Sequence, residues 1–367
     1  MNTLMILKDT WALWALLFGS AAFGLWIERT PWGARLPGAA FTLVVAFLLS
    51  NFGVIPAAAP AYTTVWLYLV PLAVPLLLFN ANVRRIPRDA GSTLLVFGIG
   101  VLGTVVGTVV AFYIVPLGKN AWQMAAVFGA AYIGGPMNYT AAVQAVGLRA
   151  PDLRAGGLAA IDLMMMVYFL LLFALPLLWS LRWGSNAQHS DRAGASINPL
   201  GLAAALALSA AICFVGFSIE SSFGWKGIAI LVIAAIAVAL AAALPHKMAA
   251  LQGANEVGML LMLVFFATIG AGADIGMVFR NKPVLLLFAT VVLLVHLAIL
   301  LAAVRYLKFG LAQVIVASSA AVGGSTSSTA MAAVRGWYQY VPVAILCGAL
   351  GFASAPFIGV WLGKLLQ

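Results

Sequence analysis

The feature that most constrains this chain is a series of long apolar segments, most of them bounded by charged residues or proline. A helix that spans a bilayer needs about 20 mostly apolar residues. Transmembrane β-strands have about ten residues of alternating polarity, whereas the runs in this chain are longer and continuously apolar. The sequence therefore predicts an all-α polytopic membrane protein. Twelve segments meet or nearly meet the required length: 10–27, 37–55, 61–80, 91–115, 121–147, 157–179, 199–219, 227–244, 257–277, 283–304, 310–334 and 341–363.

The composition excludes most other classes of protein. Hydrophobic residues make up 64% of the chain and charged residues only 8%, against about 25% charged residues in a soluble protein. A soluble enzyme, a disordered chain and a secreted disulfide scaffold therefore fit poorly. The net charge of +10 comes from basic residues scattered between apolar segments, which indicates loops on the cytoplasmic side rather than a nucleic-acid partner.

A polar stretch near the middle separates two halves of six segments each. We expect an N-terminal transmembrane repeat at 1–180, a polar central loop at 181–198 and a C-terminal transmembrane repeat at 199–367. Residues 131–148 (AYIGGPMNYTAAVQAVGL) and 320–337 (AAVGGSTSSTAMAAVRGW) align at an offset of 189, with six of 18 positions identical. Both stretches lie in the fifth segment of their half. Internally duplicated membrane proteins of this kind are typically secondary transporters.

The Gly-Gly step in each fifth segment predicts a break in the helix. Pro136 follows the first step and has no N–H to donate, while a run of Ser and Thr follows the second. Irregular backbone is tolerated in a bilayer only where it is buried in protein or lines a cavity. The N-terminus of a second half-helix favours an anionic group, and free carbonyl, Asn and Ser/Thr oxygens suit Na⁺. The candidate substrate-binding residues are Gly134, Gly135, Asn138, Tyr139, Thr140, Gly323, Gly324, Ser325, Thr326, Ser327, Ser328 and Thr329.

Two alternatives stay open for the fifth segments. Small-residue motifs also let transmembrane helices pack closely, although two motifs at matching positions favour a binding site. If both segments re-enter on one side, each half has five crossings and the two repeats are inverted. If both segments cross the membrane, the repeats are parallel. Within the inverted arrangement, the distribution of Lys and Arg favours an orientation with the central loop inside.

A second set of polar residues could bind the coupling ion, and Na⁺ is expected at these positions. Asp162 lies within the sixth segment, where a carboxylate is costly and indicates function by default; the alternative is an acid at a helix end near the headgroups. Asn80 and Asn82, with Thr268 close to them in the repeat alignment, either complete a cation site or sit at helix ends. We interpret His296, in the tenth segment, as a histidine that is hydrogen-bonded within the bundle. The candidate ion-coupling residues are Asn80, Asn82, Asn138, Asp162, Thr268 and Ser327.

The step IGGPMNYTAAVQAVGL resembles the Pro/Gly-Gly-x-x-Asn motif of bile acid/sodium symporters and the Gly-Gly motifs of sodium/glutamate and sodium/citrate symporters. Over nearly its full length the chain is similar to the YjcL-like membrane proteins, a family of unassigned function. The wider superfamily, which includes cation/proton antiporters, implies panel and core domains, crossing discontinuous helices and elevator-type alternating access. It implies that Asn138 is the motif's Asn. Bile acid symporters also have an acidic ligand in the second broken helix, and this chain has none between Gly310 and Val334.

These patterns predict a secondary active transporter that moves a small anionic organic solute, such as a carboxylate, an amino acid or a short peptide, coupled to Na⁺. The alternative is a cation/proton antiporter that uses Asp162. Catalytic motifs and clustered His, Asp or Glu do not stand out, so we expect no enzymatic activity. We expect no cofactor apart from Na⁺ or H⁺ as coupling ion, and a multi-pass location in the plasma (inner) membrane. The expected partners are the lipid bilayer and the solute, without nucleic acid; a homodimer stays open.

Overall fold

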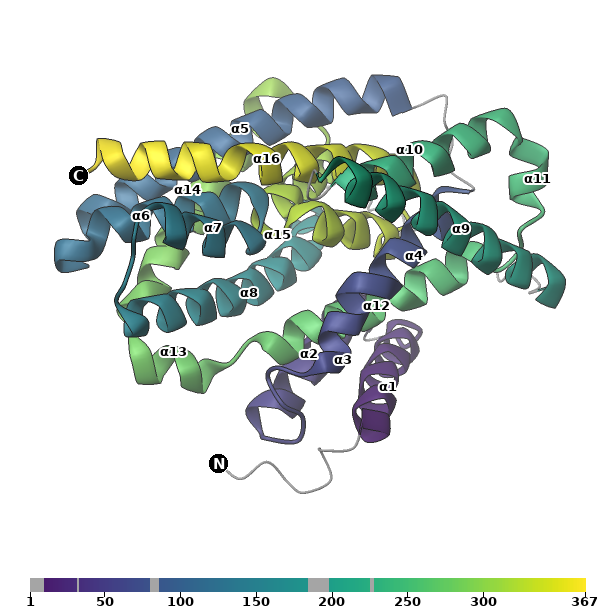
Figure 1. Cartoon of the computed structure of the whole chain (residues 1–367), viewed down its shortest axis with the longest axis horizontal. Coiled ribbons are helices and arrows are strands. Elements are labelled where there is room, and N and C mark those ends of the chain that lie inside the picture. The colour runs from purple at the N-terminus through teal and green to yellow at the C-terminus, as the bar shows by residue number, and fades with distance from the viewer. Residues whose placement is uncertain (1–9, 32, 80–85, 184–197, 225–227) are drawn as a thin grey trace. The chain divides into compact units, whose positions relative to one another are not determined.

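A computed structural model describes residues 10–31, 33–79, 86–183, 198–224 and 228–367 (Figure 1). Within these ranges the secondary structure is helical and contains no strand. Eight of the described helices are long and apolar enough to cross a membrane. The prediction of an all-α polytopic membrane protein is confirmed at this level.

The chain forms two compact units, and each unit takes residues from both halves of the sequence. Unit 1 comprises residues 1–89, 173–271 and 329–345, and unit 2 comprises residues 90–172, 272–328 and 346–367. Several long helices therefore belong to unit 2 over one part of their length and to unit 1 over the other.

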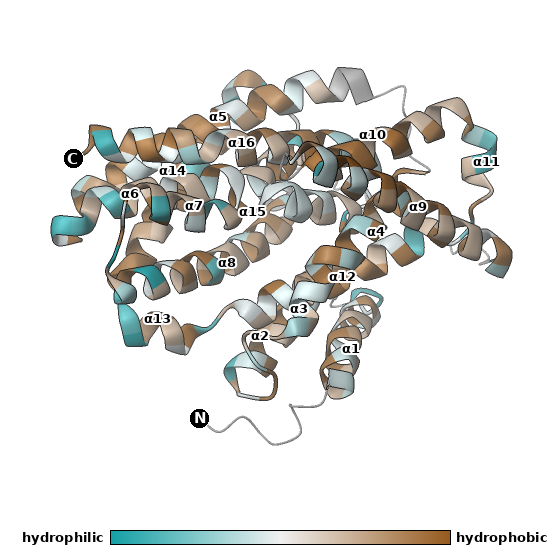
Figure 2. Cartoon of the chain, in the orientation of Figure 1, coloured by the Kyte–Doolittle hydropathy of each residue, from teal (hydrophilic) through white to brown (hydrophobic). Residues whose placement is uncertain are grey.

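Unit 1 is built mainly from apolar helices of the first and third quarters of the chain. Helix α1 packs against α2, and α4 packs against α9 and α10. Figure 2 shows that α9 and α10 are hydrophobic along most of their length, whereas hydrophilic residues gather at α11. The helices are α1 (Thr10–Glu28), η2 (Gly33–Arg35), α2 (Gly38–Asn51), α3 (Pro60–Thr64), η3 (Val65–Leu69), α4 (Val70–Leu78), α9 (Pro199–Phe223), α10 (Ile228–Ala243), α11 (Pro245–Ala249), α12 (Ala254–Gly272) and η6 (Tyr338–Tyr340).

The third apolar segment is one helix with a π-helical turn, η3, in its middle. Pro71 lies just after this turn and cannot donate to the carbonyl four residues earlier, and its ring would clash with that carbonyl. The helix widens instead, so that the N–H of Val70 bonds to the carbonyl of Val65. The widened turn carries Trp66, whose ring meets Phe265 of α12 edge-on at a centroid distance of 4.7 Å.

Unit 2 contains both fifth segments. Its helices α5 and α14 approach closely along three glycines of α5: a Cβ on Gly107 would lie 2.6 Å from the carbonyl oxygen of Val292. The helices are α5 (Ile86–Ile114, in unit 2 from Ala90), η5 (Gly118–Asn120), α6 (Ala121–Gly134), α7 (Met137–Ala145), α8 (Pro151–Trp183, to Leu172), α13 (Ile275–Asn281), α14 (Val284–Leu307), α15 (Leu311–Val334, to Ser328) and α16 (Val341–Leu365, from Leu346).

Two boundaries differ from the sequence-based expectation. The ninth segment, predicted as continuous over 257–277, ends at Gly272, and α13 begins at Ile275. Asp274 caps α13 by accepting a hydrogen bond from the N–H of Met277 at 2.9 Å, which stabilises a new helix start inside the apolar run. Helix α8 extends to Trp183, into the predicted central loop, of which residues 184–197 lie outside the described residues.

Replacing Gly270 in α12 with Ala should destabilise unit 1. A Cβ at this position would overlap the carbonyl oxygen of Leu43 in α2 and lie 3.0 Å from its carbonyl carbon. Such overpacking costs about 1–3 kcal/mol, so the midpoint of thermal unfolding in detergent should fall. Gly272→Ala is the matched control, because among the described residues nothing lies within 4 Å of its Cβ position. Equal midpoints for the two variants would contradict the close packing of α2 on α12.

Candidate functional site

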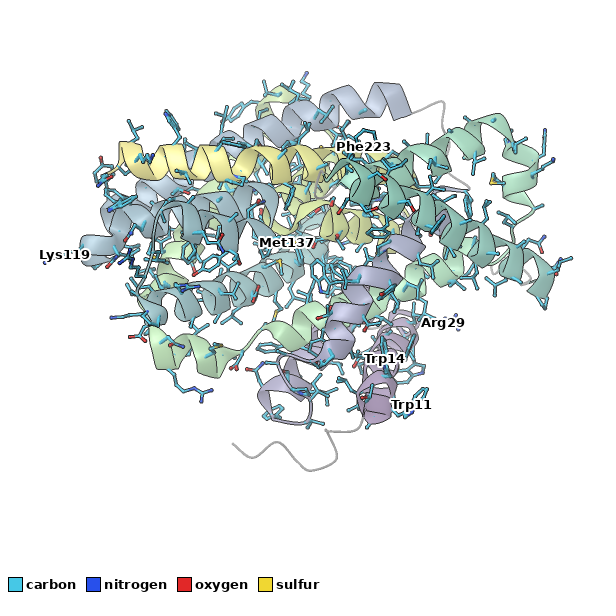
Figure 3. All side chains as sticks on the ribbon, viewed as in Figure 1. Trp11, Trp14, Arg29, Lys119, Met137 and Phe223 are labelled. Atoms are coloured by element: carbon cyan, nitrogen blue, oxygen red, sulfur yellow. The ribbon has the colours of Figure 1, made fainter. Side chains whose placement is uncertain are left out.

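The first fifth segment is interrupted at Gly135. Helix α6 ends at Gly134, Gly135 has φ 90° and ψ 165°, and α7 starts at Met137. Glycine adopts this positive φ without steric cost, and Pro136, with φ −59°, is suited to the start of the next helix. Met137, labelled in Figure 3, follows the break and is 71% exposed.

The second fifth segment is interrupted at the aligned glycine. Helix α15 runs from Leu311 to Val334, but Gly324 inside it has φ 78° and ψ −172°. It therefore consists of two half-helices on either side of Gly324. Gly135 and Gly324 are 189 residues apart, which is the offset of the sequence alignment, and both have an extended conformation with positive φ.

The two breaks contact each other backbone to backbone within unit 2. The N–H of Gly135 donates to the carbonyl of Ala321 at 3.2 Å. A Cβ on Gly135 would lie 3.0 Å from the nitrogen of Gly324 and 3.1 Å from the carbonyl carbon of Gly323. Glycine is therefore required at position 135 for two reasons: the backbone φ is positive, and the backbone of Gly323 and Gly324 leaves no room for a Cβ.

Side chains next to each break bind backbone carbonyls beside it. Asn138, which is 2% exposed, donates from Nδ2 to the carbonyl of Gly134 at 2.9 Å. Ser328 Oγ lies 3.1 Å from the carbonyls of Gly324 and Ser325 and can donate to either. The Asn138 contact replaces a helical hydrogen bond that the break removes, whereas Ser328 bonds back within its own half-helix. Part of the polarity at the breaks therefore has a structural role.

Other polar groups at the breaks are left over. Among the described residues, Ser327 Oγ and Thr329 Oγ1 are buried without a hydrogen-bond partner. Ser325 and Thr326 are half-buried at the start of the second half-helix of α15. An unpaired buried hydroxyl is costly, so Ser327 is the side chain here that gains most from a ligand.

Asp162 of α8 lies near the first fifth segment. It is half-buried and interacts electrostatically with the phenols of Tyr132 in α6 and Tyr139 in α7. Tyr139 donates to the carbonyl of Arg154 at 2.7 Å. Tyr132 is fully buried, and within the described part of the chain its hydroxyl has no hydrogen-bond partner. The carboxylate of Asp162 and the hydroxyl of Tyr132 are thus two oxygen groups of unit 2 that a cation could use as ligands.

His296 of α14 lies in a buried polar network in the same unit. Its Nδ1 is 2.9 Å from Thr104 Oγ1 and 2.9 Å from the carbonyl of Gly100, and its Nε2 is 3.0 Å from Ser318 Oγ. The interpretation of His296 as a histidine hydrogen-bonded inside the bundle is confirmed.

Two glycines of α16 bring this helix against both breaks. A Cβ on Gly348 would overlap the nitrogen of Ser325, and a Cβ on Gly351 would lie 2.6 Å from the carbonyl oxygen of Ile133. Sequence reasoning missed these positions, although small residues in membrane helices are a general signal of close helix contact.

Unit 2 brings together most of the candidate residues. Eleven of the twelve substrate-binding candidates, from Gly134 to Ser328, lie in it with Asp162, and Thr140 is exposed; Thr329 is the first residue of the next stretch of unit 1. Thr268 lies in α12 of unit 1, where its hydroxyl donates to the carbonyl of Phe265 at 2.7 Å. Asn80 and Asn82 lie outside the described residues.

Comparisons with known proteins agree on a family. A family model described as "Protein of unknown function (DUF819)" matches residues 15–367. The "Uncharacterized membrane protein YjcL" of Bacillus subtilis (strain 168) is 32% identical over 395 residues, covering 99% of this chain and 98% of the relative.

Gly135→Ala should cost more stability than Gly118→Ala. Both glycines have positive φ, 90° and 67°, and a left-handed conformation costs an alanine about 1–2 kcal/mol. Gly135 additionally faces the backbone of Gly324, whereas among the described residues nothing lies within 4 Å of a Cβ on Gly118. We expect a further loss of about 1–3 kcal/mol at Gly135, measured as a lower midpoint of thermal unfolding. Equal losses would mean that the two breaks do not touch.

Proposed function

The chain belongs to the DUF819 family, and from the geometry of its broken helices we propose that it is a secondary active transporter. Its solute is a small anionic organic molecule, such as a carboxylate, an amino acid or a short peptide, and its coupling ion is Na⁺. The chain acts in the plasma (inner) membrane and has no enzymatic activity.

One observation carries the proposal: two helix interruptions lie against each other in one unit. The N–H of Gly135 bonds to the carbonyl of Ala321, beside the second interruption at Gly324. Interrupted helices at corresponding places of two halves are the usual position of substrate and ion sites in secondary transporters. Close packing alone would be achieved by continuous helices, without the loss of helical hydrogen bonds.

The second break is the better site for the anionic group. The half-helix that starts at Ser325 presents first-turn N–H groups, which have no partner within a helix and carry a partial positive charge. Ser325 and Thr326 are half-buried there, and Ser327 Oγ is an unpartnered hydroxyl in the described structure. The side-chain amide of Asn138 at the first break donates from Nδ2 to the carbonyl of Gly134. Its side-chain oxygen, Oδ1, is the part that could still bind an ion.

We propose that the carboxylate of Asp162 is the negatively charged ligand of the coupling ion. Bile acid symporters, which the chain resembles, place an acidic ligand in the second broken helix, and the sequence has none there. Asp162 of α8 instead interacts electrostatically with Tyr132 and Tyr139 of the first broken segment. Asp162, Asn138 and Ser327 together would supply the oxygen ligands that suit Na⁺.

The two units support alternating access. Each is compact by itself, and only unit 2 holds the two crossing breaks. We propose that unit 2 is the mobile core domain and unit 1 the panel domain of an elevator-type transporter, built from inverted repeats.

A cation/proton antiporter is the second candidate. The observation that favours it is the same half-buried Asp162, whose neighbour Tyr132 has a free hydroxyl among the described groups. A carboxylate that alternately holds a proton and a cation would suffice for exchange.

Ser327→Ala should weaken Na⁺ binding by about tenfold, since the variant removes one of few available oxygen ligands. The measurement is ²²Na⁺ binding to the purified protein by scintillation proximity, followed by uptake of ¹⁴C-labelled pyruvate, succinate, citrate and glutamate into proteoliposomes under a Na⁺ gradient. Ser222→Ala, which changes an exposed serine of α9 that bonds to its own helix, should behave as wild type. Absence of ²²Na⁺ binding in the wild type would refute Na⁺ coupling.

The transport of the wild type in a pH gradient, together with the effect of Asp162→Asn, separates the symporter from the antiporter. In a symporter it should reduce Na⁺-driven uptake, and a pH gradient alone should drive no cation exchange in the wild type. In an antiporter, a pH gradient should drive Na⁺ or K⁺ exchange in the wild type, and Asp162→Asn should abolish it.

A further inference from the structure

Pro136 leaves one particular carbonyl without its helical donor. In a continuous helix the N–H of residue 136 would donate to the carbonyl of Tyr132, four residues earlier. Proline has no N–H, and Tyr132 is fully buried. A buried carbonyl without a donor is strongly unfavourable, so another group must supply the hydrogen bond.

Thr104 of α5 can supply that hydrogen bond. Its Oγ1 lies 3.2 Å from the carbonyl oxygen of Tyr132, and the side chain is fully buried. The same hydroxyl is also 3.2 Å from the carbonyl of Gly100 and 2.9 Å from Nδ1 of His296. A threonine hydroxyl has only one proton, so these three neighbours compete for it.

The tautomer of His296 decides this competition. If Nδ1 had no proton, it would be the nearest acceptor and would accept the hydrogen bond of the Thr104 hydroxyl, and Tyr132 would lose its donor. If Nδ1 carries the proton, it donates to the carbonyl of Gly100 at 2.9 Å. The hydroxyl of Thr104 is then free to donate to Tyr132.

The other ring nitrogen has partners that fit this tautomer. With the proton on Nδ1, Nε2 is an acceptor, and Ser318 Oγ lies 3.0 Å from it. Tyr168 Oη is 2.6 Å from Ser318 Oγ. The hydrogen bonds can therefore run in one direction, from Tyr168 to Ser318 to Nε2, and every group is satisfied with a neutral histidine.

The polar network lies at the first break, where Pro136 removes a backbone N–H donor, and it has no polar counterpart at the aligned positions. The residues 189 positions away from Thr104, Tyr168, His296 and Ser318 are Leu293, Phe357, Gly107 and Gly129, none of which has a polar side chain. The residue aligned with Pro136 is Ser325, which keeps its N–H. The polar network, to which both halves contribute, and the proline thus both occur at the first break, and neither has a counterpart at the positions aligned with them.

We infer that Thr104 caps the first helix break in place of the N–H that Pro136 lacks, and that His296 is a positioning residue that directs the Thr104 hydroxyl to the carbonyl of Tyr132. The capping itself follows from the contacts in unit 2. Its importance for binding rests on the proposed function, because a correctly placed break is needed there to hold the solute.

Thr104→Val and Thr104→Ser test the cap as a matched pair. Valine keeps the shape of threonine without the hydroxyl, and serine keeps the hydroxyl. Hydrogen–deuterium exchange of residues 132–138 in the full-length protein should become about tenfold faster in Thr104→Val and stay near wild type in Thr104→Ser. His296→Leu should give a smaller increase, since it removes only the orientation of the hydroxyl. Equal exchange in Thr104→Val and Thr104→Ser would overturn the inference.

A spectroscopic measurement on the wild type tests the tautomer directly and does not require Thr104→Val or Thr104→Ser to fold. The ¹⁵N chemical shifts of the imidazole should show His296 as a neutral ring with its proton on Nδ1, identified as the signal that His296→Leu lacks. A proton on Nε2 would overturn the inference. Neither measurement uses a solute or an ion gradient, so a failure here is distinguishable from a failure of ²²Na⁺ binding.

Discussion

The requirement that every backbone polar group in the apolar interior has a partner governs the arrangement of this chain. A helix satisfies it automatically, and each fifth segment gives up that advantage at one glycine. The lost partners are replaced from outside the local helix: Gly135 bonds to Ala321 of the other segment, and Asn138 bonds to Gly134. The two breaks can therefore exist only as part of a packed unit, which is why both lie in unit 2.

The two breaks satisfy this requirement to different extents. At the first, Asn138 and Thr104 bind carbonyls of α6, so that this break is closed by the protein's own groups. At the second, Ser328 can bind Gly324, while Ser327 keeps an unpaired hydroxyl within the described structure. A break whose polar groups are hydrogen-bonded within the protein is held in place, whereas a break with an unpaired hydroxyl offers a group that a ligand can bind. This difference is a physical reason to expect the solute nearer to Ser327 than to Asn138.

Much of the fold could be predicted from sequence because it depends on local quantities. The length of the apolar runs predicts the helices, and the Gly-Gly steps predict where they are interrupted. The start of α13 at Asp274 was missed, because the length of the apolar run predicts one continuous helix there. A single side-chain hydrogen bond, from the N–H of Met277 to Asp274, stabilises a new helix start instead. The donor to Tyr132 could not be found either: Pro136 shows that a donor is needed, but only the packing of α5 identifies Thr104. The roles of Asn80, Asn82 and Asp162 in ion binding stay predictions.

The polar residues of unit 2 are distributed unequally between the two halves, and the close packing explains part of this difference. Gly351 of α16 is aligned with Asp162 of α8 at the offset of 189. Any side chain at Gly351 would meet the carbonyl of Ile133 at the end of α6, so a carboxylate cannot stand there. The aligned position in α8 is half-buried and has room for Asp162. Of these two aligned positions, only the one in α8 can therefore hold a charge, and an ion that uses this charge would bind near Asp162.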